Sequence, residues 1–282
     1  MKKKNLPPVL ERYELKYLIP SSFVEPISQF IEPYCQLDFH SSNTHDLFYE
    51  VNSLYFDTRE CEFLEQRLYG KHSRFNMRVR TYAGGEPPYF LEIKHKTGSS
   101  VKKYRATASA AEWPAIITDP MYRIPDSDNE VEKCNKTLFM RLAHSYSIEP
   151  KVFTQYRRRA FFSTVDSYAR VTMDRNMKYR TQKDDGIIKN PYNMIPDKSL
   201  TNYDDETIYA INTFSEANVV LELKCNIGRV PMWMIDLIQY FQLKQVGFSK
   251  YLNSSLASRE TTSVPYRLSD RMGNQDYGCY SL

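Results

Sequence analysis

Ionic side chains alternate with apolar ones in several short segments, and this spacing is the feature of the sequence best suited to chemistry. The pairs are Glu14 and Lys16, Arg78 and Arg80, Glu92 and Lys94, Lys103 and Arg105, Arg170 followed by Thr172 and Asp174, and Glu222 and Lys224. Residues two apart in a β-strand point to the same face of a sheet. The pattern therefore predicts a sheet with one apolar face and one ionic face.

Two interpretations of the ionic face are open. It could be the wet side of a half-exposed sheet, where each cross-strand Glu–Lys pair contributes roughly a few tenths of a kcal/mol. Cations dominate it, however, because only three carboxylates, Glu14, Glu92 and Glu222, accompany ten cations. These cations are Lys16, Arg78, Arg80, Lys94, Lys103, Arg105, Arg158, Arg170, Lys224 and Lys250. Like charges that face each other destabilise a sheet, so the excess favours a face that binds a polyanion.

If the sheet closes with this face inward, its interior becomes a tunnel for a slim anionic ligand. A barrel of about eight strands has room inside for side chains and one such ligand. Of the 38 Lys and Arg and the 34 Asp and Glu residues, this assignment leaves 28 and 31 for the exterior. A slightly acidic exterior disfavours a protein that coats nucleic acid, and no nucleic-acid partner is expected.

The three inward carboxylates need a reason of their own, because carboxylates repel phosphate. A divalent metal supplies one, since Mg²⁺ or Mn²⁺ takes one or two carboxylate oxygens and completes its coordination with phosphate oxygens and water. Glu222 is the leading ligand, with Glu14 and Glu92 behind it. The alternative for each carboxylate is an ion pair with a neighbouring Lys.

The elements that must position these residues are mostly strands. Alternation predicts eight of them, at 12–19, 48–56, 75–82, 89–95, 101–105, 151–162, 168–173 and 218–225. Helical spacing predicts helices at 23–34, 60–68, 130–146 and 232–243. Strands and helices do not alternate regularly, which favours an antiparallel sheet over a parallel one. The expected fold is α+β, a closed eight-stranded antiparallel barrel with helices packed on its outside.

Composition describes an ordinary globular chain of 282 residues. The mean hydropathy is -0.57, and no apolar run approaches the roughly 18 residues of a membrane-spanning helix. No apolar stretch follows the basic N-terminus, so a secretory signal is not expected. The five cysteines are scattered and form no C-x-x-C pair, which predicts reduced thiols and a cytoplasmic protein.

No linker or repeat demands two domains. We expect an N-terminal extension at 1–8, one domain at 9–256 and a polar tail at 257–282. The polar stretch 181–214 contains two prolines and an acidic run, and is expected to form a long excursion between strands.

In this order along the chain, nine short motifs resemble the polyphosphate-polymerase (VTC) domain of the triphosphate tunnel metalloenzymes. They begin with the run from Arg12 to Tyr17 and continue with Ser53 to Thr58, Arg78 to Arg80, Leu91 to Lys94, Lys103 to Arg105, Tyr156 to Phe161, Arg170 to Asp174, Leu221 to Lys224 and Phe248 to Tyr251. The resemblance spans about residues 9–256. It implies an antiparallel β tunnel that binds the triphosphate of ATP, transfers the γ-phosphoryl group to inorganic polyphosphate and releases ADP.

Position by position, the resemblance also implies roles for individual residues. The catalytic contacts fall on Lys16, Arg78, Arg80, Arg158 and Arg170, and further phosphate contacts on Lys94, Lys103 and Lys250. Arg105 and Lys224, which alternation places on the same face, are expected to add phosphate contacts. The family's metal-binding glutamate falls on Glu222. Three arginines are adjacent at 157–159, and alternation favours the middle one for the inner face.

The sequence departs from the related patterns at two positions. Related tunnel phosphatases open with Glu-x-Glu-x-Lys, whereas Arg12 stands in place of the first Glu, which leans away from hydrolysis. The polymerase pattern has a second Lys three residues before Lys250, and here that residue is Gly247. Two other functions stay open: a metal-dependent triphosphatase, and a non-catalytic sensor of polyphosphate or inositol pyrophosphate.

Overall fold

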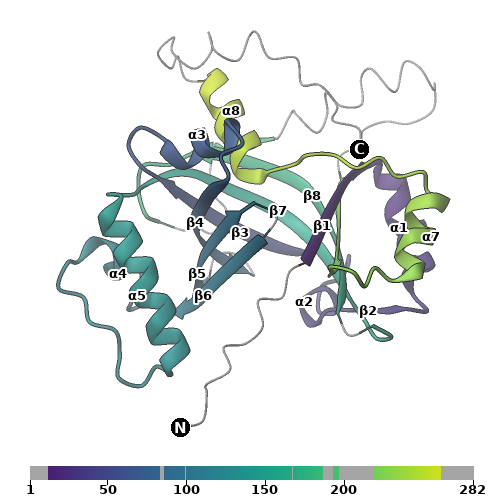
Figure 1. Cartoon of the computed structure of the whole chain (residues 1–282), viewed down its shortest axis with the longest axis horizontal. Coiled ribbons are helices and arrows are strands. Elements are labelled where there is room, and N and C mark those ends of the chain that lie inside the picture. The colour runs from purple at the N-terminus through teal and green to yellow at the C-terminus, as the bar shows by residue number, and fades with distance from the viewer. Residues whose placement is uncertain are drawn as a thin grey trace.

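A large curved β-sheet forms the centre of the molecule. The computed structural model describes residues 12–82, 86–98, 100–166, 168–186, 193–196 and 219–261. Eight strands pair antiparallel in the order β1-β10-β8-β7-β3-β4-β5-β6 (Figure 1). Their bounds are β1 Arg12–Ile19, β3 Tyr49–Asp57, β4 Ser73–Tyr82, β5 Glu86–Thr97, β6 Ser100–Ala108, β7 Glu149–Ser163, β8 Ala169–Thr181 and β10 Val219–Asn226. The eight predicted strands are confirmed, seven of them within three residues at each end, whereas β8 continues eight residues beyond the predicted end at 173.

Two shorter strands extend this sheet. β2 (Cys35–Leu37) pairs with β7, and β9 (Ile195–Pro196) pairs with β8. The extension at 1–8 and most of the predicted excursion at 181–214 and tail at 257–282 lie outside the described residues.

The prediction of a closed barrel is wrong, because the sheet curls into a half-barrel whose edge strands, β1 and β6, stay 8 Å apart. Each edge has other hydrogen-bonding partners. On β6, the Thr107 N–H donates to Glu132 and the Arg105 carbonyl accepts from Asn135. On β1, the Lys16 carbonyl accepts from the Val246 N–H. Side chains of the helix beside β6, and the backbone of the segment beside β1, thus satisfy hydrogen-bonding groups of the two edge strands. These groups therefore do not need to pair with the opposite edge strand.

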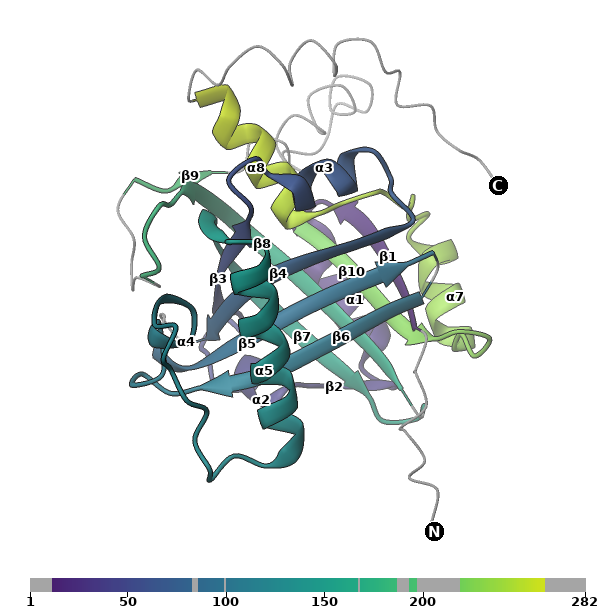
Figure 2. The same cartoon turned by 60° about the vertical axis from the view of Figure 1, so that its left-hand side comes forward.

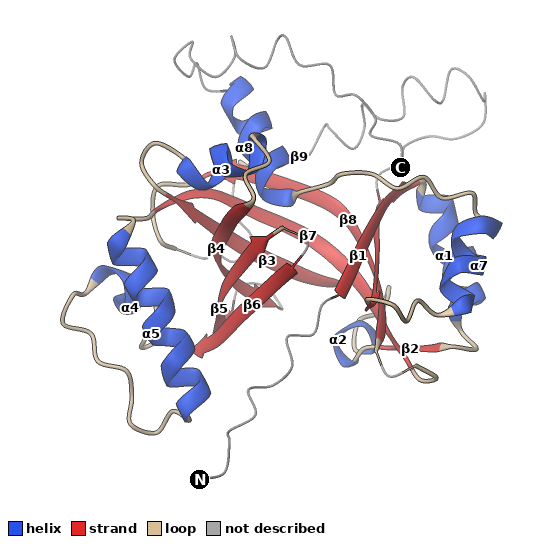
Figure 3. Ribbon diagram, viewed as in Figure 1, coloured by secondary structure: helices blue, strands red, loops and turns tan. Residues whose placement is uncertain are grey.

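Helices cover the convex side and one end of the half-barrel (Figures 2 and 3). Next to β1 and β10 lie α1 (Val24–Ile31) and α7 (Met232–Tyr240), and α5 (Glu130–Ser145) crosses β5 and β6 together with α4 (Ala115–Thr118). α3 (Glu62–Leu68) and α8 (Lys250–Thr261) sit together at one end. The four predicted helices are confirmed in shortened form, whereas α2 (Phe39–Ser42), α4, α8 and the 3-10 turn η1 (Ser21–Phe23) were not predicted.

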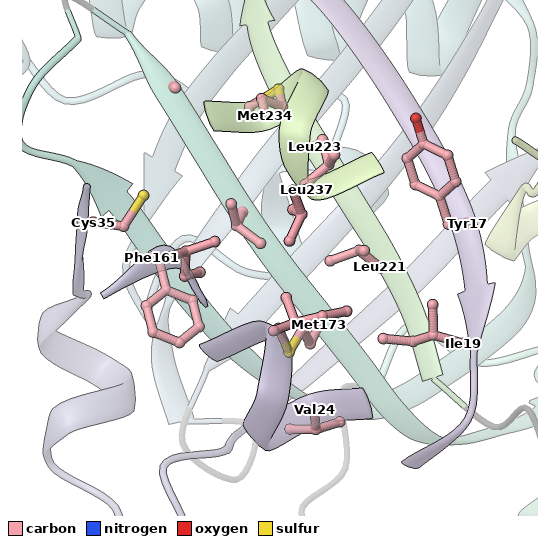
Figure 4. Packing of buried hydrophobic residues seen from close by; sticks show 14 of the residues in the cluster. Tyr17, Ile19, Val24, Cys35, Phe161, Met173, Leu221, Leu223, Met234 and Leu237 are labelled. Atoms are coloured by element: carbon pink, nitrogen blue, oxygen red, sulfur yellow. The ribbon is translucent and has the colours of Figure 1, made fainter. Parts of the chain in front are cut away.

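The two larger apolar cores lie on the convex side of the sheet, whereas two smaller buried clusters, which include Tyr55, Tyr156 and Tyr251, lie on its concave side beside the cavity. One core joins the convex face of β1, β10 and β8 to α1 and α7, and Figure 4 shows Leu221 and Leu223 of β10 beside Met234 and Leu237 of α7. In a second core, the strands β3, β4, β5 and β6 pack against α4 and α5. Leu221 and Leu223 alternate with Glu222 and Lys224, so each strand packs its apolar side on helices and turns its ionic side inward.

Among the described residues, none of the helices combines the length and the apolar character needed to cross a membrane.

Candidate phosphate-binding cavity

The concave side of the half-barrel holds a cavity of about 240 Å³. All thirteen site residues predicted from the sequence line it. The residues that share the wall with them are Tyr55, Arg67, Asn76, Tyr82, Val101, Tyr156, Ser249 and Tyr251. Alternation on seven strands thus brings the predicted strand residues together on one face, and Lys250 joins them from α8. The cavity forms although the sheet does not close.

The wall formed by β4, β5 and β6 is built around Glu92. Its carboxylate lies 2.7 Å from Arg78 and from Lys103, and 3.9 and 3.8 Å from Arg80 and Arg105. Burial raises the pKa of Glu92, but Arg78, Arg80 and Lys103 together hold it well below its ordinary value. Glu92 is therefore a permanent counterion that keeps four cations side by side.

The opposite wall, on β1 and β10, is looser. The cations nearest to Glu222 are Lys224 at 3.3 Å and Lys16 at 3.9 Å. Burial raises the pKa of Glu222, and the charges of Lys224, Lys16 and Lys250 lower it well below the ordinary value. Glu222 is thus an ionised carboxylate without a contact as short as those of Glu92.

Glu14 connects the two edges of the half-barrel. It lies on β1 diagonally across from Glu222, and its carboxylate contacts Lys94 of β5 at 2.5 Å and Lys224 at 3.9 Å. The ion pair with Lys94 joins β1 to the β5–β6 side across the open seam. Burial and Glu222 raise the pKa of Glu14, but Lys94 and Lys224 together hold it below its ordinary value.

The carboxylates that line the cavity differ in how well they could bind a divalent metal ion. Glu222 fits, because its oxygens lack short contacts with cations and Glu14 lies on the adjacent strand. Glu92 does not fit, because its two oxygens already contact guanidinium and ammonium groups, which is the ion-pair alternative weighed above. In the described part of the chain, no group of three or more His, Cys, Asp and Glu side chains is arranged to hold a metal.

A buried ion triad forms the floor between β7, β8 and α8. Asp174 accepts from Arg158 at 2.6 and 2.8 Å and from Lys250 at 2.6 Å, and the Lys250 ammonium lies 4.6 Å from the centre of the Tyr156 ring. Burial raises the pKa of Asp174, but Arg158 and Lys250 hold it far below its usual range. The triad fixes both cations toward the cavity.

The choice among the three adjacent arginines follows the alternation of β7. Arg158 lines the cavity, whereas Arg157 pairs with Asp46 and Arg159 with Glu25, away from it.

Two further predicted cations have contacts of their own. The Lys16 ammonium donates to the Phe248 carbonyl at 2.8 Å, and burial lowers its pKa to about 8 in spite of Glu222. Arg170 lies 3.5 Å from Asp38. His95, which follows Lys94 on β5, lies 3.0 Å from the Ser73 hydroxyl and packs edge-on against Phe75.

Sequence reasoning missed the parts that hold the α3–α8 end together. Asp57 accepts from the N–H groups of Thr58, Phe63 and Leu64, and from the Tyr251 hydroxyl at 2.5 Å. This carboxylate fixes the start of α3 against α8. The Asp57–Thr58 pair was noticed as part of a motif, but alternation assigned it no role. Arg67 was missed because it lies on a helix, where a period of two gives no signal.

The model of the VTC domain family matches residues 11–258 of the chain. Similar solved structures include a candidate adenylate cyclase from Bacillus halodurans, with 12% identity, a TM-score of 0.44 and coverage of 85% of this chain and 96% of that chain. The PH1819 protein from Pyrococcus horikoshii has 8% identity, a TM-score of 0.41 and coverage of 88% and 98%. The candidate adenylyl cyclase HpAC1 from Hippeastrum, described as having a dominant triphosphatase activity, has 12% identity, a TM-score of 0.44 and coverage of 89% and 97%. No curated protein matches the chain.

Proposed function

The chain belongs to the VTC domain family, and we propose that it is a polyphosphate polymerase that moves the γ-phosphoryl group of ATP onto inorganic polyphosphate. One observation carries this proposal: ten predicted cations, nine from seven strands and Lys250 from α8, converge on a single cavity whose lining contains three carboxylates. Such a wall suits a linear string of phosphates, because each Arg or Lys offers charge-assisted hydrogen bonds to phosphate oxygens.

The reaction makes few demands on covalent chemistry. A terminal phosphate oxygen of the chain attacks the γ-phosphorus, the bond to the β-phosphate oxygen breaks, and ADP leaves with its electron pair. The attacking oxygen is already ionised, so no general base is required. Alignment and neutralisation of charge supply most of the acceleration.

The cavity residues divide this work between them. Arg78 and Arg80, on the same wall as Glu92, would neutralise phosphate charge from one side. Arg158 and Lys250 on the floor, and Lys16 on the opposite wall, would neutralise it from the other sides. Asp174 and Glu92 keep these cations aligned before a ligand arrives. Glu222, with Glu14, would hold a divalent metal ion, which neutralises phosphate charge when bound.

A single incubation tests the proposal. The purified protein is mixed with ATP and Mn²⁺ or Mg²⁺, and ADP, free phosphate and long-chain polyphosphate are measured. ADP together with long chains supports the polymerase. ADP with stoichiometric free phosphate would instead make the protein a triphosphatase, and binding without any turnover would make it a sensor. The same incubation with Glu222→Gln tests the proposed metal ligand, and Glu130→Gln, which removes a carboxylate that is 94% exposed on α5, is its matched control.

A further inference from the structure

A second group of cations lies beyond the predicted site, at the α3 end of β4 and β5. Arg74 and Lys96 are direct partners in the β4–β5 register, two residues beyond the cavity-lining pair Asn76 and Lys94. They therefore lie on the same face of the sheet as the cavity. Residues 75 and 95, which lie between these pairs in sequence, are on the other face, where the Phe75 ring contacts Tyr146, the residue after α5.

The helix α3 adds a third cation to this pair. Arg67, in its last turn, lines the cavity and is placed there because Asp57 fixes the start of the helix. The three cations are close enough to affect one another: burial and then Arg74, Arg67 and Lys94 lower the pKa of Lys96. Burial and then Arg74 likewise lower the pKa of Arg67.

These three cations lack the counterions that the other cavity cations have. Among the described residues, no carboxylate lies within ion-pair distance, about 4 Å, of Arg67, Arg74 or Lys96. The Nε atoms of Arg67 and Arg74 are buried and have no hydrogen-bond partner in the described part of the chain. Like charges in direct cross-strand register destabilise a sheet, and a buried donor without a partner costs about 1–3 kcal/mol. An ordinary solvated strand end would avoid both costs, whereas a bound anion would remove both.

We propose that Arg67, Arg74 and Lys96 form a distal subsite for the phosphate chain, which holds polyphosphate residues remote from the reacting phosphoryl group. Arg74 is four strand residues from Arg78, about 13 Å along β4. A ligand with three phosphates bound at the Glu92 wall would fall short of the subsite, whereas a longer chain would reach it. This inference rests on the proposed function, because it assumes that the cavity binds a phosphate chain.

The test compares two ligands that differ only in length. The full chain and the triple variant Arg67→Ala, Arg74→Ala, Lys96→Ala are titrated with tripolyphosphate and with long-chain polyphosphate at fixed ionic strength. Charge-assisted hydrogen bonds to phosphate are stronger than neutral ones, so we expect long-chain affinity to fall at least about tenfold. Tripolyphosphate affinity is expected to change less than about twofold.

A second triple variant controls for net charge. Lys102→Ala, Arg141→Ala and Lys178→Ala remove three exposed cations from other parts of the surface. The distal subsite is wrong if long-chain affinity falls no further in the first variant than in this control, or if both ligands weaken equally. Failure of the proposed function has a different signature: the unmodified protein would then bind neither ligand.

Discussion

The two walls of the cavity contain the same kinds of residue but arrange them differently. On the β4–β6 wall, Glu92 is 2% exposed and contacts Arg78 and Lys103 at 2.7 Å. On the β1–β10 wall, the nearest cations to Glu222 lie at 3.3 and 3.9 Å. A carboxylate with both oxygens in short ion pairs is part of the scaffold, whereas one with longer contacts is available to a metal ion. Burial and ionisation alone would not separate the two, because the pKa values of both are well below normal.

The largest expected effect is on turnover in Glu222→Gln. Glutamine keeps the shape but loses the charge that a divalent metal needs, so we expect the rate of ADP formation to fall on the order of 1,000-fold. The free energy of unfolding should change by only about 1 kcal/mol, because the ion pairs of Glu222 are long. Steady-state kinetics and urea unfolding measure the two quantities. Activity at the wild-type level would remove Glu222 from the metal site.

Glu92→Gln, unlike Glu222→Gln, should lower the free energy of unfolding more than it lowers turnover. The change leaves Arg78, Arg80, Lys103 and Arg105 without their shared counterion. Several of these cations are partly exposed, so we expect a loss of about 2 kcal/mol, below the range for a fully buried pair. Tripolyphosphate should restore much of the melting temperature, because it replaces the missing negative charge. If the variant is as stable as the wild type and tripolyphosphate raises both melting temperatures equally, Glu92 is not the counterion described here.

The pH dependence of ligand binding should report on the Glu92 wall. Burial, together with the charges of Arg78 and Arg80, lowers the pKa of Lys103 to about 7 in spite of the opposing effect of Glu92. Free Lys103 is therefore largely neutral above pH 7, and a bound phosphate favours its charged form. Binding should take up protons near pH 8, and affinity for tripolyphosphate should fall about fivefold between pH 7 and pH 9.

Two variants isolate this effect from titration of the ligand itself. Lys103→Arg keeps its charge and should flatten the profile, whereas Lys102→Arg, on the outward face of β6, should not. The lowered pKa of Lys103 has the opposite consequence for the stability of the free protein. The pKa of Lys103 is about 7 in the folded protein and 10.5 in the unfolded chain, so the contribution of Lys103 to the free energy of unfolding increases as pH rises from about 7 to 10.5. A profile that stays the same in both variants would contradict the assignment.

The sequence predicted much of the cavity because its signal is local. A period of two on each strand determines which face Arg78, Arg80 or Arg158 occupies, whatever the strand pairs with. The outer cores are predicted by the same parity. The open seam could not be predicted in this way, because it depends on distant partners such as Glu132 and Val246, which occupy the strand edges.

The roles within the cavity were also beyond the sequence pattern. Glu92 and Glu222 occur in similar local motifs, Leu-Glu-Ile-Lys and Leu-Glu-Leu-Lys. What separates them is cross-strand register: Glu92 faces Arg78 and Arg105 on its two sides, whereas Glu222 faces Lys16 and Thr172. Arg78, directly opposite, and Lys103, diagonally opposite, contact the Glu92 oxygens at 2.7 Å, whereas Lys16 opposite Glu222 lies 3.9 Å away and Thr172 carries no charge.

The smallest expected effect concerns the looser wall, where Gly247 stands in place of a family lysine. A side chain at this position meets no other heavy atom within 4 Å of its Cβ. It would lie between Val246 and Phe248, whose backbone groups contact Lys16. Gly247→Lys should therefore fold normally and strengthen tripolyphosphate binding about twofold, since a partly solvated charge contributes less than about 1 kcal/mol.

Gly247→Gln, of similar length and without charge, is the matched variant, and isothermal titration at two salt concentrations measures both. The gain should appear only with Lys and shrink at high salt. Burial is the main reason that the pKa of Lys16 is about 8, and the charges of Lys250 and Lys94 also lower it. If Gly247→Lys weakens tripolyphosphate binding instead, the β1–β10 wall cannot accept another cation. Its long ion pairs would then not mean that the wall has space for a ligand.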